Sequence, residues 1–218
     1  MINQSTFNFL SELAANNNRE WFTDNKQRYE EAKENVLDFT GELIKELNRF
    51  DKAVSADLDP KKCVMRIYRD IRFSKDKTPY KDNFGIGNLR TGRVHIGYYV
   101  QIQPGRNLAG GGYWMPEADH LKLIRQEVDY NADDLKKIID APEFKKFFGE
   151  FRAQEQLKGA PRDYEADNEN IDLIKLKSFA ALHQLTDAEM MKKDSPKRVA
   201  EVLGYIYPLT TFLKNALA

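Results

Sequence analysis

The spacing of apolar residues predicts helices in the N-terminal third of the chain. Apolar side chains recur at every third or fourth position from Tyr29 to Phe50, which is the period of one helix face. A shorter stretch with the same period begins near Phe7, with Ser5 as its expected N-cap. An asparagine of the run 16–18 is expected to cap the helix that follows. We expect the long apolar stripe to face the core rather than to form a coiled coil.

The period changes to two between about residues 62 and 115. The clearest strand has an apolar face opposite a face of hydrogen-bonding groups, and its apolar residues are Val94, Ile96, Tyr98, Val100 and Ile102. The run 104–107 is a turn signal, so residues 108–114 are expected to return as the next strand of an antiparallel hairpin. Residues 84–89 are expected to pair on the other side.

The helical period returns after Pro116, with breaks near Asn131, Pro142 and Pro208 and a polar loop over 159–169. Helices, then strands, then helices, without β-α-β alternation, are typical of an α+β protein. We therefore predict a central antiparallel sheet (about residues 62–115) packed by N-terminal and C-terminal helices. A chain of 218 residues can be served by one hydrophobic core, so a single domain over 1–218 is expected.

Composition favours a globular intracellular protein. Apolar residues make up 41% and charged residues 31%, and 13 Phe and 10 Tyr can fill a core. No apolar run approaches the ~20 residues of a membrane helix and the first ten residues do not resemble a signal peptide, so we expect a cytoplasmic protein without a membrane partner. Cys63 is the only cysteine and the three histidines are scattered, so neither a metal site nor a cofactor is predicted.

Charge is balanced over the whole chain but not along it. Lys plus Arg and Asp plus Glu both number 34, so no global field attracts nucleic acid, which is an improbable partner. Residues 61–93, however, hold ten basic and three acidic residues, a net charge of +7, and the rest of the chain sums to −7. Any functional site is therefore expected within this cationic stretch.

Alternation within the cationic stretch singles out Arg69. If residues 63–73 formed a regular strand, Arg69 would interrupt an apolar face that includes Cys63, Ile67 and Phe73. A buried guanidinium without a partner costs several kcal/mol. Either the strand bends near Asp70, or Arg69 has a carboxylate partner or a ligand.

Three interpretations of the stretch follow. The first, which we favour, is a site for a small phosphate- or carboxylate-bearing ligand, because guanidinium forks match such oxygens; its residues would be Arg66, Arg69, Asp70, Arg72, Asp76, Lys77 and Tyr80. The second is a surface that binds nucleic acid or protein. The third is an internal ion-pair network, in which the arginines reach the acidic residues of 117–177 (eleven basic, fifteen acidic). Only Asp70 and Asp76 are near enough to act as an acid or base, so binding is predicted more strongly than catalysis.

The stretch also resembles the signature of a bacterial family of unknown function, domain of unknown function 2461. Eight positions in fifteen residues carry the resemblance: Arg66, Arg69, Asp70, Arg72, Phe73, Asp76, Lys77 and Tyr80. It continues in residues 18–22, 98–101 and 110–113 and in Arg125, and it weakens over 157–169. The resemblance implies no reaction. A signature made mostly of charged residues nevertheless favours a site over core packing.

Two further features are weaker candidates. The glycines at 110–112 are expected in a hairpin turn or bulge, although such a run can also present N–H groups to an anion. His95 shares the polar strand face with Tyr99 and Gln101, which makes it the first histidine to test as an acid or base.

Overall fold

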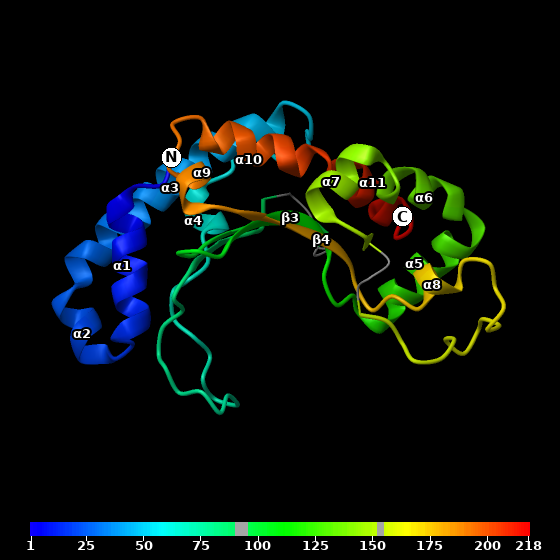
Figure 1. Cartoon of the computed structure of the whole chain (residues 1–218), viewed down its shortest axis with the longest axis horizontal. Helices are drawn as coiled ribbons and strands as arrows, with labels where there is room; N and C mark the ends of the chain where they lie inside the picture. Colours follow the sequence, from blue (N-terminus) through cyan, green and yellow to red (C-terminus); the bar gives the residue numbers. More distant parts are fainter. Residues whose placement is uncertain (90–95, 152–154) are drawn as a thin grey trace. The chain divides into compact units, whose positions relative to one another are not determined.

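The computed structural model describes residues 1–89, 96–151 and 155–218, and within them the protein is α+β (Figure 1). The N-terminal helices are α1 (Gln4–Ala15), α2 (Arg19–Asp24), α3 (Lys26–Asn48) and α4 (Pro60–Cys63). The strands are β1 (Phe84–Ile86), β2 (Gly97–Ile102), β3 (Asn107–Tyr113) and β4 (Phe179–Leu185). The remaining helices are α5 (Ala118–Tyr130), α6 (Ala132–Ile139), α7 (Pro142–Phe148), α8 (Ile171–Ile174), α9 (Asp187–Met190), α10 (Ser195–Gly204) and α11 (Tyr207–Asn215).

The long stripe of α3 faces the core, as predicted. Val36, Phe39, Leu43 and Leu47 are all fully buried. The preceding helix α2 is capped as expected, because the side chain of Asn18 accepts a hydrogen bond from the backbone N–H of Trp21 (2.9 Å). The predicted cap of α1 is wrong: that helix begins at Gln4, after Asn3, and Ser5 lies inside its first turn.

The four strands form one antiparallel sheet in the order β1-β2-β3-β4. The register of the first pair is fixed by Phe84 opposite Ile102 and Ile86 opposite Val100. Burial alternates along β2, with the even-numbered residues 98, 100 and 102 buried and the odd-numbered ones half-buried. The α+β prediction is therefore confirmed, and the sheet also includes β4, which lies outside the predicted range of about 62–115.

The glycines at 110–112 lie inside β3 rather than in a turn. A Cβ at Gly110 would overlap the carbonyl oxygen of Ala181, and one at Gly112 would overlap that of Phe179. Gly112 also has φ +115°, which L-residues with side chains rarely adopt. These glycines allow the backbones of β3 and β4 to pack closely.

Contacts divide the described residues into two compact units. One contains residues from 1–91, 99–109 and 184–201, and its core includes the rings of Phe9, Phe22, Tyr29 and Phe84. The other contains residues from 92–98, 110–183 and 202–218, with an aromatic core formed by Phe144, Phe148, Phe151 and Phe179. Strands β2, β3 and β4 each contribute residues to both units, and the single domain over 1–218 stays a prediction. None of the described helices combines the length and apolar character that crossing a membrane requires.

Candidate functional site

Residues 64–82 form an irregular antiparallel hairpin, here called the cationic hairpin. Figure 1 shows this segment leaving the sheet and returning to it before β1. Its two arms are joined by hydrogen bonds from the N–H of Arg69 to the carbonyl of Pro79 (3.0 Å) and from the N–H of Lys81 to that of Ile67 (2.7 Å). The regular strand considered for 63–73 is therefore wrong, since only isolated bridges form at Val64 and Tyr68.

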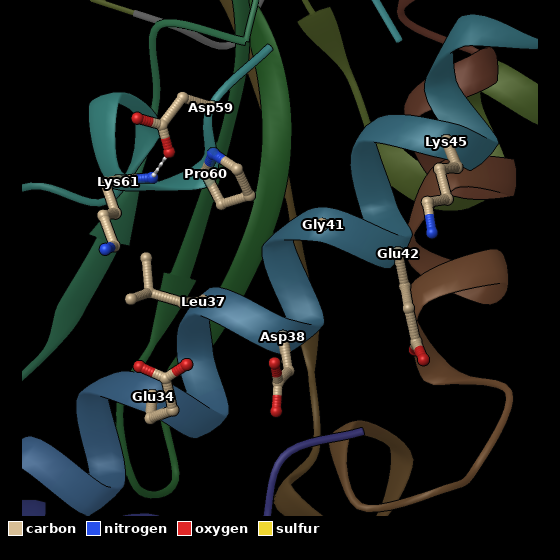
Figure 2. Close-up of a pocket in the computed structure, with 9 residues that line it drawn as sticks. All are labelled: Glu34, Leu37, Asp38, Gly41, Glu42, Lys45, Asp59, Pro60 and Lys61. Carbon is tan, nitrogen blue, oxygen red and sulfur yellow. Dashed lines mark hydrogen bonds between the residues drawn. The ribbon is translucent and has the colours of Figure 1, made fainter. Parts of the chain in front are cut away.

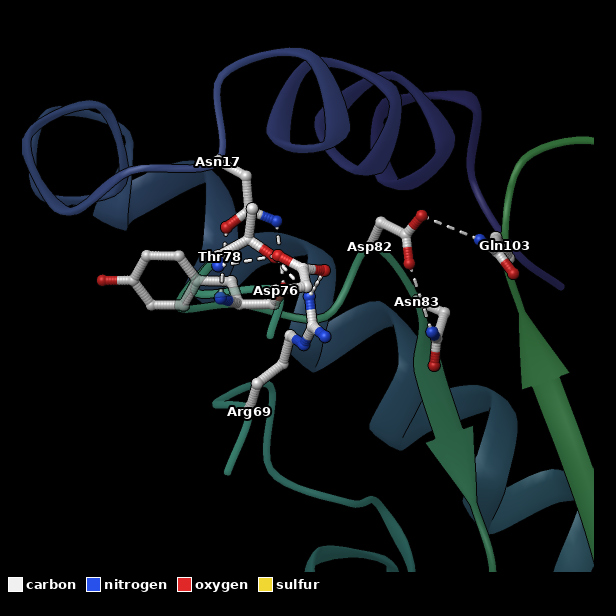
Figure 3. Close-up of polar contacts among 8 residues, drawn as sticks. Asn17, Arg69, Asp76, Thr78, Asp82, Asn83 and Gln103 are labelled. Atoms are coloured by element: carbon white, nitrogen blue, oxygen red, sulfur yellow. Dashed lines mark hydrogen bonds and ion pairs between the residues drawn. The ribbon is translucent and has the colours of Figure 1, made fainter. Parts of the chain in front are cut away.

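Arg69 has the acidic partner that its position required. Its guanidinium donates to the Asp76 carboxylate and to the Thr78 hydroxyl, and its side chain is only 29% exposed (Figure 3). Asp76 accepts from the N–H of Thr78 at 3.0 Å and from its hydroxyl at 2.9 Å. Hydrogen bonds from Thr78 and Arg69 lower the pKa of Asp76 to about 2. These contacts lie within the hairpin, so Arg69 does not reach the acidic residues of 117–177.

Arg72 is also paired within the hairpin, but near the surface. Its Nε and one terminal nitrogen donate to the two oxygens of Asp70 at 3.0 and 2.7 Å, and the Arg72 side chain is 76% exposed. The hydrogen bonds from Arg72 hold the pKa of Asp70 below its ordinary value. Exposed pairs of this kind are screened by water and contribute little to stability, so an external anion can compete for Arg72. Nearby, the Lys77 ammonium donates to the carbonyl of Ile71 (2.9 Å).

Tyr80 fixes one arm of the hairpin to the N-terminal helices. Its ring is buried and stacks on Phe22, with centroids 3.9 Å apart and planes at 13°. Its backbone is bracketed by the Asn17 amide, which donates to the Tyr80 carbonyl at 3.0 Å and accepts from the Tyr80 N–H at 3.1 Å. Tyr80 therefore has a packing role that the sequence did not indicate, and nothing in the local pattern pointed to Asn17.

Arg66 and Lys81 differ from Arg69 and Arg72, the two cations of the hairpin that have ion-pair partners. Arg66 is exposed and Lys81 half-buried, and no ion pair with an acidic side chain engages either one among residues 1–89, 96–151 and 155–218. Burial, followed by the neighbouring charge of Arg66, lowers the pKa of Lys81. Two cations thus lie near each other, and although the Asp70 charge also interacts with Arg66, neither cation forms an ion pair among the described residues. Lys81 was not among the predicted site residues, although it directly follows Tyr80.

A row of hydrogen bonds runs along the polar face of β2 to the base of the hairpin. The Tyr99 hydroxyl donates to the Gln101 amide oxygen (3.1 Å), and the Gln101 amide nitrogen donates to the Gln103 oxygen (2.8 Å). Gln103 in turn donates to the Asp82 carboxylate (2.9 Å), as Figure 3 shows. Asp82 also accepts from Asn83 (3.4 Å), so the third carboxylate of the hairpin is engaged as well.

Comparison with family models found a match over residues 5–212 to the family described as "Conserved hypothetical protein (DUF2461)". The chain belongs to this family. Neither a search of curated proteins nor a search of solved structures found a match. The family suggested by the cationic stretch is thereby confirmed over nearly the whole chain. Its description assigns no reaction, ligand or partner to a DUF2461 protein.

The other candidate residues of this DUF2461 chain have structural surroundings. Cys63 is buried, and burial raises the pKa of its thiol to about 11, which fits a small core side chain. His120 is hydrogen-bonded to the Tyr113 hydroxyl (2.7 Å), and His183 to the carbonyl of Phe147 (2.8 Å). His95 lies outside the described residues. Within the described ranges, no group of three or more His, Cys, Asp and Glu side chains is arranged to hold a metal ion.

A cavity of about 490 Å³ lies between α3 and α4 of the same DUF2461 chain (Figure 2). Its lining residues are Glu34, Leu37, Asp38, Gly41, Glu42, Lys45, Asp59, Pro60 and Lys61. Four of these are acidic and two are basic, so the cavity has the opposite charge to the cationic hairpin. No feature of the sequence had indicated it.

Proposed function

We propose that the protein binds a small phosphate- or carboxylate-bearing molecule at the base of the cationic hairpin, with Arg66 and Lys81 as the main ligands. The observation that carries the proposal is that these two cations lie near each other with no ion-pair partner among the described residues, while Lys81 is half-buried. Like charges held together in a partly desolvated position disfavour the ligand-free state. An anion would supply both cations with an ion-pair partner, which Asp70 does not, although its charge interacts with Arg66.

The remaining residues of the signature are proposed to support this site. Arg69 is held by Asp76 and Thr78, and Tyr80 by packing against Phe22, so these side chains shape the hairpin. Arg72 is the exception, because its exposed pair with Asp70 can open to let it join the ligand. Lys77 contributes positive charge at the tip of the hairpin, which is formed by residues 70–77.

Binding is favoured over catalysis by the state of the nearby carboxyl groups. Hydrogen bonds from Arg72 lower the pKa of Asp70, and those from Thr78 and Arg69 lower that of Asp76 to about 2. A general base works best with a pKa near the working pH, so both carboxylates would be weak bases. The balanced total charge favours a small molecule over nucleic acid, and we propose the cytoplasm as the location.

Calorimetric titration with inorganic phosphate and with citrate at low salt tests the proposal. Binding is expected in the unaltered protein and is expected to be lost in an Arg66→Gln, Lys81→Gln double variant. Lys75→Gln together with Lys62→Gln is the matched control, because it removes the same formal charge from exposed positions of the cationic stretch. Equal binding by both double variants would show that only net charge matters and would refute the site.

Thermal unfolding without ligand gives a second, independent measurement. Lys81→Met is expected to stabilise the ligand-free protein, because it removes a partly desolvated charge and its repulsion by Arg66. Strong destabilisation by this change would mean that Lys81 serves the fold and not a ligand.

A further inference from the structure

The tip of the cationic hairpin exposes a large aromatic side chain. Phe73 is 96% exposed, and on the same hairpin Tyr68 and Met65 are 52% and 38% exposed. Covering a phenylalanine side chain with apolar surface typically strengthens association by about 10-fold to 100-fold. The ring of Phe73 is left uncovered by the described part of the chain, so its apolar surface can strengthen association with a partner.

The surroundings of Phe73 are positively charged. Lys75 and Lys77 are exposed, and Arg72 lies with its guanidinium carbon 5.9 Å from the centre of the Phe73 ring. The carboxylates of the tip do not offset these lysines, since Asp70 is paired with Arg72 and Asp76 with Arg69. A fitting partner surface has an apolar recess with acidic side chains at its rim.

The cavity between α3 and α4 has this character. Glu34, Asp38 and Glu42 follow one another at four-residue intervals, so they lie along one face of α3, and Asp59 lies on the opposite wall (Figure 2). Leu37, Gly41 and Pro60 provide the apolar part of the lining, and the four carboxylates outnumber the two lining lysines, Lys45 and Lys61. Glu34 and Asp38 form no ion pair within the described ranges. A cavity of about 150 Å³ is enough for benzene, so about 490 Å³ can accept a benzyl side chain with ammonium groups at its rim.

We propose that the tip of the cationic hairpin docks into the α3/α4 cavity of a second copy of this chain. A chain does not fill its own cavity, because Figure 1 shows the tip at the end of the hairpin away from α4. The two surfaces have complementary charge, because Lys75 and Lys77 of one copy would meet the row of carboxylates on α3 of the other. One tip alone buries less than the ~1,200 Å² of a typical stable complex, so reciprocal docking, which makes the contact twice, gives the expected two-fold dimer.

Sedimentation velocity over a series of protein concentrations at low salt tests this proposal. The unaltered protein is expected to show a reversible dimer that weakens as salt is added. Phe73→Ala is expected to weaken dimerisation at least tenfold, and its folding should be unaffected because the side chain is exposed. A protein that stays monomeric at every concentration, or a dimer that Phe73→Ala leaves intact, overturns the proposal.

Charge reversal provides the more stringent test. A tip variant (Lys75→Glu, Lys77→Glu) and a cavity variant (Glu34→Lys, Asp38→Lys) should each be monomeric alone. Mixed together, they should form a heterodimer, because each reversed surface then meets an opposite charge on its partner. The control variant Lys192→Glu, Lys193→Glu makes the same change in net charge as the tip variant, at exposed residues elsewhere, and should dimerise normally. Failure of the mixture to associate while both variants remain folded refutes the docking.

The dimer does not depend on the proposed anion site. The double variant Arg66→Gln, Lys81→Gln should lose phosphate binding and still dimerise. Phe73→Ala should lose dimerisation and still bind phosphate.

Discussion

Replacing Asn17 with alanine should release the cationic hairpin from the N-terminal helices. The Asn17 amide makes two partly buried hydrogen bonds to the backbone of Tyr80, at 3.0 and 3.1 Å, and alanine can make neither. At about 1 kcal/mol for each bond, the loss is about 2 kcal/mol. For a chain of this length that corresponds to a fall in Tm of about 4–8 °C.

Hydrogen exchange measured by mass spectrometry locates the effect. The amides of Arg69 and Lys81, which join the two arms, should exchange about 30-fold faster in the variant, since 2 kcal/mol of local stability is lost. Asn16→Ala is the control, because the Asn16 side chain is exposed and bonds only the Glu12 carbonyl; it should change stability by about 0.5 kcal/mol or less. Unchanged exchange in the hairpin of the Asn17 variant would refute the view that this amide holds it.

Three further predictions concern separate parts of the chain. Gly110→Ala should prevent stable folding, judged by circular dichroism and solubility, because its Cβ overlaps a carbonyl oxygen of β4; Gly159→Ala, with open space around it, should be tolerated. Cys63, with a thiol pKa raised to about 11, should not react with a disulfide reagent at pH 8 until denaturant unfolds the protein. The carboxyl group of Asp76 should titrate near pH 2 by NMR, so its contribution to stability is complete above its ordinary pKa of about 4 and is lost as the pH falls through 2. Arg69→Gln should raise the pH at which Asp76 titrates, and an unchanged titration midpoint would contradict the pairing of Arg69 with Asp76.

The elements predicted correctly from the sequence are those set by local periodicity. The stripe of α3 and the alternation of β2 each require only neighbouring residues, and both are confirmed by burial. Strand β4 was not predicted, because its pairing with β3 joins segments some seventy residues apart and its sequence, Phe179–Leu185, carries no clear alternation. Long-range pairing of this kind leaves little local signal.

The cationic hairpin shows why alternation alone misplaced some side chains. The parity argument correctly required a partner for Arg69, but it assigned Phe73 to a buried face, whereas Phe73 is 96% exposed. The physical reason is local: Asp70 accepts from the N–H of Arg72 and Asp76 from that of Thr78, so each aspartate bonds the backbone two residues on. Such turns compete with regular strand pairing. The charged residues of the signature thus shape the segment that displays them.

The hydrogen bonds in the row from Tyr99 to Asp82 all run in the same donor-to-acceptor direction. An ionised carboxylate can only accept hydrogen bonds, so Asp82 requires Gln103 to present its nitrogen, and Gln103 then presents its oxygen to Gln101. By the same logic Gln101 presents its oxygen to Tyr99, and every dipole in the row has one sense. The Asp82 carboxylate at one end of the row and the Arg106 carbonyl beside Gln101 therefore both favour the arrangement in which the Tyr99 hydroxyl donates to Gln101. If Asp82 were neutralised, the Gln103 amide would be free to turn over, whereas Gln101 would keep its orientation, because its nitrogen also donates to the Arg106 carbonyl at 3.1 Å.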